Sequence, residues 1–392
     1  MSRRTRLTSA VLAALVLAPL LGGCWDRKEV NDLALVTGLA IDQRDDDLIE
    51  VSVQIFIPQD SSQGDQSSGE ATGGIGTTFV QTASGSNIAD ALAQLQTKFS
   101  RRIFWGHTAV YIFGEDKTKQ GVKNELDYLM RDTEPRERSF IFVSKGRARE
   151  ILEKHSVLER NTSEVLREMA LNKTSISSTM AHLMEMLEDE SKTALLPWVD
   201  ILQTPHQNDQ TKGIGYIDGT AILYKGRLIG VANNRVSRGI LWAVDKMDNA
   251  IITIRPEHSE GTLSVQLLRN RTFLEPVYTN GEWSVTIHVS CKNQLIQNTT
   301  GINIAQSAAS LSSIEKQLEH NIEERIHLAV DEARNKYKAD IFNIAGAFHR
   351  KYPQLWKKHE KEWDTIFPTI KFAVQAKASI LRPGMFNTQQ SN

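Results

Sequence analysis

The chain has 392 residues, of which 40% are hydrophobic, and its 46 basic residues nearly balance its 47 acidic ones. If residues 1–23 are removed as a leader, 43 basic residues face 47 acidic ones and the net charge is −4. This balance argues against a nucleic-acid-binding protein, which needs a clustered basic surface to neutralise phosphates. Beyond residue 23 no run approaches the roughly 18 apolar residues of a membrane-spanning helix. A chain of this length normally divides into two or three domains.

The first 24 residues have the pattern of an export and anchoring signal. Three arginines precede a mostly apolar run over 7–21, which is too short to span a bilayer but typical of a signal peptide. Leu21-Gly22-Gly23-Cys24 then resembles a bacterial lipobox, in which the cysteine is acylated and the bond before it is cut. We therefore predict a signal peptide over 1–23 and a membrane lipid anchor at Cys24, where two or three acyl chains give stable attachment. An uncleaved anchor helix and an ordinary core cysteine are the alternatives.

Lipidation of Cys24 leaves Cys291 without a partner, so a disulfide framework is excluded. Cys291 ends the alternating run Trp283–Cys291, which is typical of a half-buried strand. We expect its thiol to be a small core group, with a reactive thiol as the alternative.

Apolar spacing predicts the elements of an N-terminal α+β domain over 24–205. Two strands, 33–42 and 48–57, flank an acidic turn at 45–47, and the polar stretch 59–76 is expected to be a disordered loop. Further strands are expected over 108–113 and 139–143, and helices over 88–99, 120–130, 147–154, 161–171 and 176–189. The stretch Leu196–Gly213, with Pro197 and Pro205, is a plausible boundary.

The rest of the chain predicts a middle segment over 206–255 and a C-terminal α+β domain over 256–392. The middle segment consists of a hairpin (216–224 and 228–231) and a helix (235–245). The C-terminal domain has strands over 262–268, 272–278 and 283–291, and a long helix that ends at about 338. Two short helices (340–350 and 354–364) and a closing strand over 370–380 follow. Ser312 and Glu315 fit a capping box for the long helix, and Asp340 fits a cap for the next one. We predict a multi-domain α+β fold with mostly antiparallel sheets packed with helices, rather than a βαβ repeat.

No constellation of catalytic residues is convincing. Gly213–Gly219 resembles a phosphate loop only loosely, because it does not lie between a strand and a helix, and turn glycines are the better interpretation. His320 and His327 are seven residues apart and lack the spacing of a helical zinc site, so we expect a solvated helix face. His107 fits a hydrogen-bonded structural histidine better than a general base.

Two further clusters permit both a structural and a functional interpretation. Arg131-Asp132, with Arg136 and Arg138, fits a structural ion-pair network better than an anion site. Trp356 and Trp363 lie in a stretch rich in lysine and aromatic residues. They fit core positions on short helices, but the lysines could also face anionic lipid headgroups and the tryptophans could dock on a partner.

A series of distinctive blocks begins directly after the lipobox with Cys24-Trp25-Asp26-Arg27. The blocks that follow are Val36–Asp42, Trp105-Gly106-His107, Leu129–Asp132, Gly219–Ile222, Ser237–Trp242 and Asp340–Trp356, and together they span nearly the whole chain after the leader. In content and order these blocks resemble the Ger(x)C family, the lipoprotein C subunits of spore germinant receptors, for which the first block is fairly specific.

The resemblance implies a non-enzymatic subunit of a nutrient germinant receptor, assembled with a membrane A subunit and a transporter-like B subunit. It also implies an α+β fold in about three domains and a place on the outer side of the spore inner membrane. No catalytic residue, cofactor or metal ligand carries over from the family. Only Cys24 carries over, as the lipidation site. The rival hypotheses are a solute-binding lipoprotein of a transporter and an envelope or cortex hydrolase.

Overall fold

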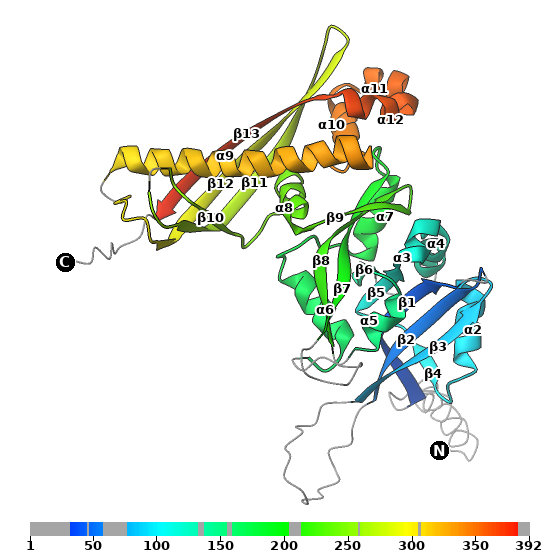
Figure 1. Ribbon diagram of the computed structural model, residues 1–392. Coiled ribbons are helices and arrows are strands. Elements are labelled where there is room, and N and C mark those ends of the chain that lie inside the picture. Colours follow the sequence, from blue (N-terminus) through cyan, green and yellow to red (C-terminus); the bar gives the residue numbers. More distant parts are fainter. Residues whose placement is uncertain are drawn as a thin grey trace, which may run out of the picture.

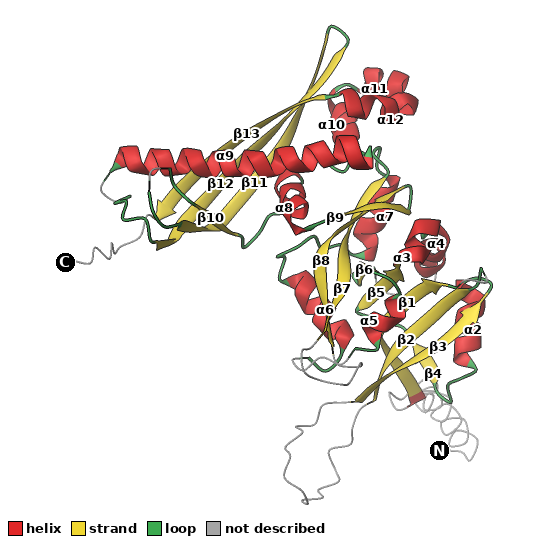
Figure 2. Cartoon of the chain, in the orientation of Figure 1, coloured by secondary structure: helices red, strands yellow, loops and turns green. Residues whose placement is uncertain are grey.

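A computed structural model of the chain describes residues 32–44, 47–57, 77–131, 137–154, 159–203, 213–257, 259–304 and 307–382. The leader, Cys24, the 59–76 stretch, Asp132 and Arg136 lie outside these residues, so the predictions made for them stay predictions. Figures 1 and 2 show two β-sheets with helices packed against each, joined through the short helix α8 (Asn234–Ala243) and the long helix α9 (Ala308–Glu332).

The first sheet has nine strands in the order β3-β2-β1-β5-β6-β7-β8-β9, with β4 beside β1. Its middle pairs, β1–β5, β5–β6 and β6–β7, are parallel, whereas the outer pairs are antiparallel. All five residues of β5 are buried, as expected for a parallel strand covered on both faces. The strands are β1 Leu33–Gln43, β2 Ile49–Ile57, β3 Thr77–Gly85, β4 Arg102–Phe104, β5 Val110–Gly114, β6 Phe140–Ser144, β7 Thr193–Gln203, β8 Gly213–Tyr224 and β9 Arg227–Ala232.

Helices cover both faces of this sheet. On one face α2 (Ile88–Gln96), α4 (Lys123–Arg131) and α7 (Met180–Glu188) bury apolar side chains in one core cluster. On the other face α5 (Ala148–Leu152) and α6 (Thr162–Leu171) form a second cluster. The helix predicted over 120–130 is found as α4, and the short α3 (Glu115–Gln120), which was not predicted, ends before it at Gly121, whose φ is 122°.

The second sheet has the order β10-β11-β12-β13, with β13 parallel to β12. Helix α9 lies along one face of it (Figure 1) and buries Ile314, Leu318, Ile322 and Ile326 in the core between helix and sheet. A π-helical turn, Ala333–Tyr337, continues α9 and ends at Lys338 in the left-handed conformation. The remaining elements are β10 Ile251–Ile254, β11 Leu263–Thr279, β12 Glu282–Asn298, α10 Ile344–Lys351, α11 Pro353–His359, α12 Trp363–Ile366 and β13 Lys371–Arg382, with 3₁₀ turns on either side of α12 at Glu360–Glu362 and Phe367–Thr369.

The predicted α+β class and the long helix near the C-terminus are confirmed, although the sheets are mixed. The first sheet takes in β8 and β9 of the predicted middle segment, and the predicted domain limits stay a prediction.

Pro197, from the stretch proposed as a boundary, is inside β7, at a register shift where the ladder tolerates its missing N–H. Two local predictions are wrong. The strands predicted over 262–268 and 272–278 are the single strand β11, because a β-bulge between Leu267 and Arg269 takes the place of a turn and the polar residues 269–271 continue the ladder with β12. The long helix begins at Ala308 with Ser307 as its N-cap, so Ser312 does not form the predicted capping box.

Candidate functional site

The polar residues that the sequence singled out do not converge on a reaction centre. His320 and His327 are exposed on α9, as predicted, and His320 lies 3.3 Å from Glu324. Arg131 pairs with Asp127 on its own helix at 2.8 Å, and Arg138 is exposed. Within the described ranges no three or more His, Cys, Asp or Glu side chains are grouped as metal ligands.

The other candidates have structural surroundings. His107 is exposed, with its ring 5.8 Å from that of Phe104, and its side chain has no hydrogen-bond partner among the residues that the structure covers, contrary to the prediction. Gly213–Gly219 lies within β8, which excludes a phosphate loop and replaces the predicted turn. Cys291 is buried, as predicted, and burial raises the pKa of its thiol to about 11, so the thiol stays protonated at neutral pH.

The two tryptophans of the lysine-rich stretch belong to the core. Trp356 and Trp363 are 5% and 4% exposed, and their ring centroids are 5.2 Å apart. Trp283 of β12 meets Trp363 edge-on at 5.8 Å. The core interpretation is therefore confirmed, and these rings are not free to dock on a partner.

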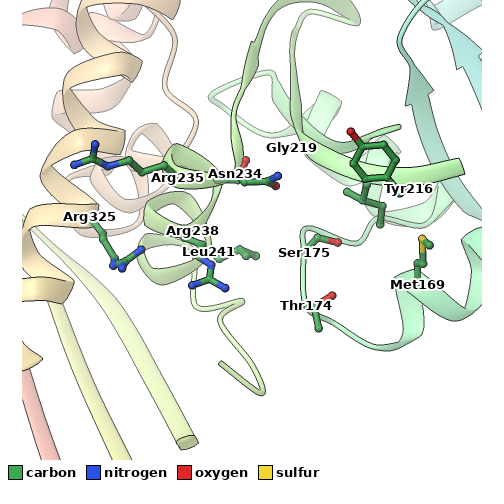
Figure 3. A pocket seen from close by; sticks show the side chains of 12 residues that line it. Met169, Thr174, Ser175, Tyr216, Gly219, Asn234, Arg235, Arg238, Leu241 and Arg325 are labelled. Carbon is green, nitrogen blue, oxygen red and sulfur yellow. The ribbon is translucent and has the colours of Figure 1, made fainter. Parts of the chain in front are cut away.

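A groove between the first sheet and the α8–α9 pair is the candidate site. It has a volume of about 620 Å³, and its walls come from α6, the connection between α6 and α7, β8, α8 and α9. Figure 3 shows Arg325 reaching from α9 toward Arg238 of α8, with Thr174, Ser175 and Tyr216 on the opposite side. The lining residues are Met169, Thr174, Ser175, Tyr216, Ile217, Gly219, Asn234, Arg235, Ser237, Arg238, Leu241 and Arg325.

Close packing of α8 on α9 brings the arginines together. The Cβ of any other residue at position 239 would lie 2.0 Å from the carbonyl oxygen of Arg325, so only glycine allows this approach. The Oδ1 atom of Asn233 caps α8 by accepting from the Val236 N–H, and Thr220 on β8 donates to Ser237 at 2.9 Å. These contacts fix the arginine-bearing face of α8 between β8 and α9.

The groove is cationic. Three of its lining residues are arginines and none of its described lining residues is a carboxylate, although Asp218 beside it accepts a hydrogen bond from Asn234 at 3.0 Å. Figure 3 shows Arg238 and Arg325 directed toward each other, whereas Arg235 extends away from Thr174 and Ser175. The Arg325 Nε donates to Asn321 at 2.9 Å, whereas the side chains of Arg235 and Arg238 have no ion-pair or hydrogen-bond partner among the described residues. Burial, followed by the charges of Arg238 and Arg235, lowers the pKa of Arg325. The three positive charges therefore repel one another at a site that a bound anion would stabilise.

Sequence reasoning missed this groove. Arg235 and Arg238 are three residues apart and so share one face of α8, which is a usable signal. Arg325 belongs to a helix far along the chain, and no local pattern links it to them.

None of the helices in the described part of the chain combines the length and the apolarity needed to cross a bilayer.

Comparisons with known proteins cover almost the whole chain. Residues 26–201 match the family model of the spore germination protein N-terminal domain, and residues 218–384 match that of the spore germination B3/GerAC-like C-terminal region. Spore germination protein KC of Bacillus subtilis (strain 168) is 27% identical over 99% of this chain and 98% of its own. Spore germination protein B3 of the same organism is 24% identical over 97% and 99%. The crystal structure of the GerBC protein, 18% identical, superposes with a TM-score of 0.54 over 91% of this chain and 100% of that chain, which shows a shared fold.

Proposed function

Since the chain belongs to the Ger(x)C family of spore germination proteins, we propose that it is the non-catalytic C subunit of a nutrient germinant receptor. One observation carries the proposal: the two germination-protein models match consecutive segments, 26–201 and 218–384, in the order of the family. In this proposal the chain assembles with membrane A and B subunits, and its surfaces supply the binding energy.

The same proposal assigns the chain to the outer side of the spore inner membrane, held by acylated Cys24. The lipobox-like sequence before Cys24 supports the anchor. Anchoring confines the subunit to a layer beside its partners, so weak contacts suffice for assembly, because the effective concentration is high.

The test replaces Cys24 with Ala in the spore-forming host. We expect the variant to be lost from the inner-membrane fraction together with its A subunit, and germination to fail for a subset of a nutrient panel. Cys291→Ala is the matched control, because it removes the other cysteine but leaves the lipobox intact, and it should remain in the membrane.

Each alternative result has a distinct meaning. Normal membrane retention of Cys24→Ala would contradict the lipid anchor. Lost retention with normal germination on every nutrient would keep the anchor and contradict the receptor role, in favour of a transport or wall function. Thermal stabilisation by a small solute would support the transport alternative, and turnover of peptidoglycan would support the hydrolase.

A further inference from the structure

The cationic groove has the chemistry of a site for a bound anion. Each guanidinium presents a planar fork of N–H donors that matches a carboxylate in a bidentate pair. In the described chain Arg235 and Arg238 have no such pair, and Arg325 has only the amide of Asn321. An anionic occupant would replace repulsion among the arginines with attraction.

The shape and the lining of the groove favour a polypeptide as this occupant. A volume of about 620 Å³ is far larger than a single phosphate needs. The hydroxyl groups of Thr174 and Ser175 can bond to a peptide backbone, and Met169, Ile217 and Leu241 offer apolar contact. The Asn234 amide N–H is already bonded to Asp218 at 3.0 Å. Arg235 and Arg238 are exposed, but Arg325 is half-buried on α9, so a flat membrane surface would not reach all three arginines.

We propose that this groove binds an extended segment of another polypeptide that carries at least two Asp or Glu side chains, held by Arg235, Arg238 and Arg325. The inference goes beyond the proposed receptor role, because it depends neither on the lipid anchor nor on which proteins are the receptor partners. The groove is bordered by both the first sheet and the α8–α9 pair, so an occupant contacts both halves of the molecule.

Binding to a defined probe tests the proposal directly. The full chain, purified in neutral detergent, is titrated into a fluorescent oligo-glutamate peptide, and anisotropy gives the Kd. We expect a combined Arg235→Gln, Arg238→Gln and Arg325→Gln variant to bind about tenfold more weakly. The single variant Arg238→Gln, at an exposed position, should give a smaller loss of about threefold and covers the case in which the triple variant fails to fold.

The matched control removes the same charge elsewhere. Arg101, Lys357 and Lys358 are exposed and do not line the groove, so their combined replacement by Gln should leave the Kd unchanged. A neutral oligo-glutamine peptide should not bind.

Three results would overturn the proposal. One is failure of the unaltered chain to bind oligo-glutamate at millimolar concentration. Another is equal binding by the groove variants and the control variant. The third is arginine-dependent binding of phosphatidylglycerol vesicles or inorganic phosphate in the absence of peptide binding, which would assign the groove to a lipid headgroup or a free anion.

Discussion

At the scale of single residues, Asp340 fixes the turn between α9 and α10. The carboxylate is fully buried, and its Oδ1 accepts from the backbone N–H groups of Ile344 at 3.0 Å and Phe342 at 3.3 Å. Its Oδ2 accepts from the Ala345 N–H at 2.7 Å and from the indole N–H of Trp363 at 3.2 Å. Burial raises the pKa of Asp340, and the four donors act in the opposite direction. One side chain therefore joins a helix start to the tryptophan cluster.

Replacing Asp340 with Ala should lower the free energy of unfolding by about 3 kcal/mol or more, because it leaves several buried N–H donors without an acceptor. Urea unfolding followed by tryptophan fluorescence measures this loss.

Trp363→Phe is the matched variant for that experiment. It keeps an aromatic ring but removes the indole N–H donor and part of the buried ring volume, and should cost about 2 kcal/mol, less than the loss of all four hydrogen bonds. Equal losses in the two variants would mean that packing of the ring, and not the hydrogen bonds to Asp340, stabilises this turn.

At the scale of elements, α9 lies along one face of the second sheet and its glutamates reach the edge strand β13. Glu315, Glu319 and Glu323, spaced four residues apart, accept hydrogen bonds from the N–H groups of Ile380, Ala378 and Ala376 at 2.8, 3.1 and 2.9 Å. Four helical residues rise about 6 Å and two strand residues about 6.6 Å, so the two repeats match over this length. The free N–H groups of an edge strand readily pair with other chains. The glutamates block that pairing.

Combined replacement of Glu315, Glu319 and Glu323 with Ala should expose this edge. We expect at least about tenfold faster hydrogen exchange at the three amides of β13 and concentration-dependent association, measured by mass spectrometry and light scattering. The Gln variant keeps three side-chain acceptors and should behave like the unaltered chain. If the Gln variant changes as much as the Ala variant, charge rather than hydrogen bonding protects the edge.

Glu315 also shows how far sequence reasoning reaches. Alternation in Trp283–Cys291 and the apolar stripe of α9 are local patterns, and both elements are found where they were predicted. The role of Glu315 depends on a strand far along the chain, so its spacing from Ser312 gave a false capping box. Strand β3 escaped prediction because its Thr, Ser and Gln content is typical of a loop, although pairing with β2 holds it in the sheet.

At the scale of the whole molecule, the two halves meet through side chains of the α9–α12 region. The Tyr337 hydroxyl lies 3.1 Å from the carbonyl oxygen of Val231 on β9 and 2.7 Å from Glu332. Gly230 makes room for its ring, because a Cβ there would lie 2.6 Å from a ring carbon. Burial, followed by the hydrogen bond to Glu332 and its charge, raises the pKa of Tyr337 above its ordinary value of 10.0.

The raised pKa of Tyr337 makes the stability of this contact between the two halves depend on pH in the basic range. An unfolded tyrosine loses its proton near pH 10, whereas folded Tyr337 keeps it, so its contribution to stability is complete below about pH 10 and falls as the pH rises further. We expect the free energy of unfolding to decrease above that pH, measured by urea denaturation.

The matched variant is Tyr337→Phe, which lacks the ionising group. It should be less stable at neutral pH and should lose less stability in base than the unaltered chain. Equal pH dependence in the two proteins would assign the effect to other groups.

At this scale the cationic groove could not be predicted from the sequence. The i, i+3 spacing of Arg235 and Arg238 is readable from the sequence, but their approach to Arg325 results from the packing of α8 on α9 at Gly239. Tertiary packing, not local pattern, creates the charge density there. Trp363 shows the opposite case, since a core position on a short helix was already the favoured interpretation.

The parallel pairing of β13 with β12 also sets an order of events during synthesis. Strand β12 leaves the ribosome before α9, and β13 follows only after α10–α12. Until β13 has been synthesised, the apolar stripe of α9 and one edge of β12 lack the strand that they contact in the folded protein. A partly synthesised chain therefore exposes apolar surface that can aggregate. The first sheet depends on no later strand of the second and is free to fold earlier. We therefore expect a chaperone to be needed most while the second half of the chain is being synthesised, when this apolar surface is exposed.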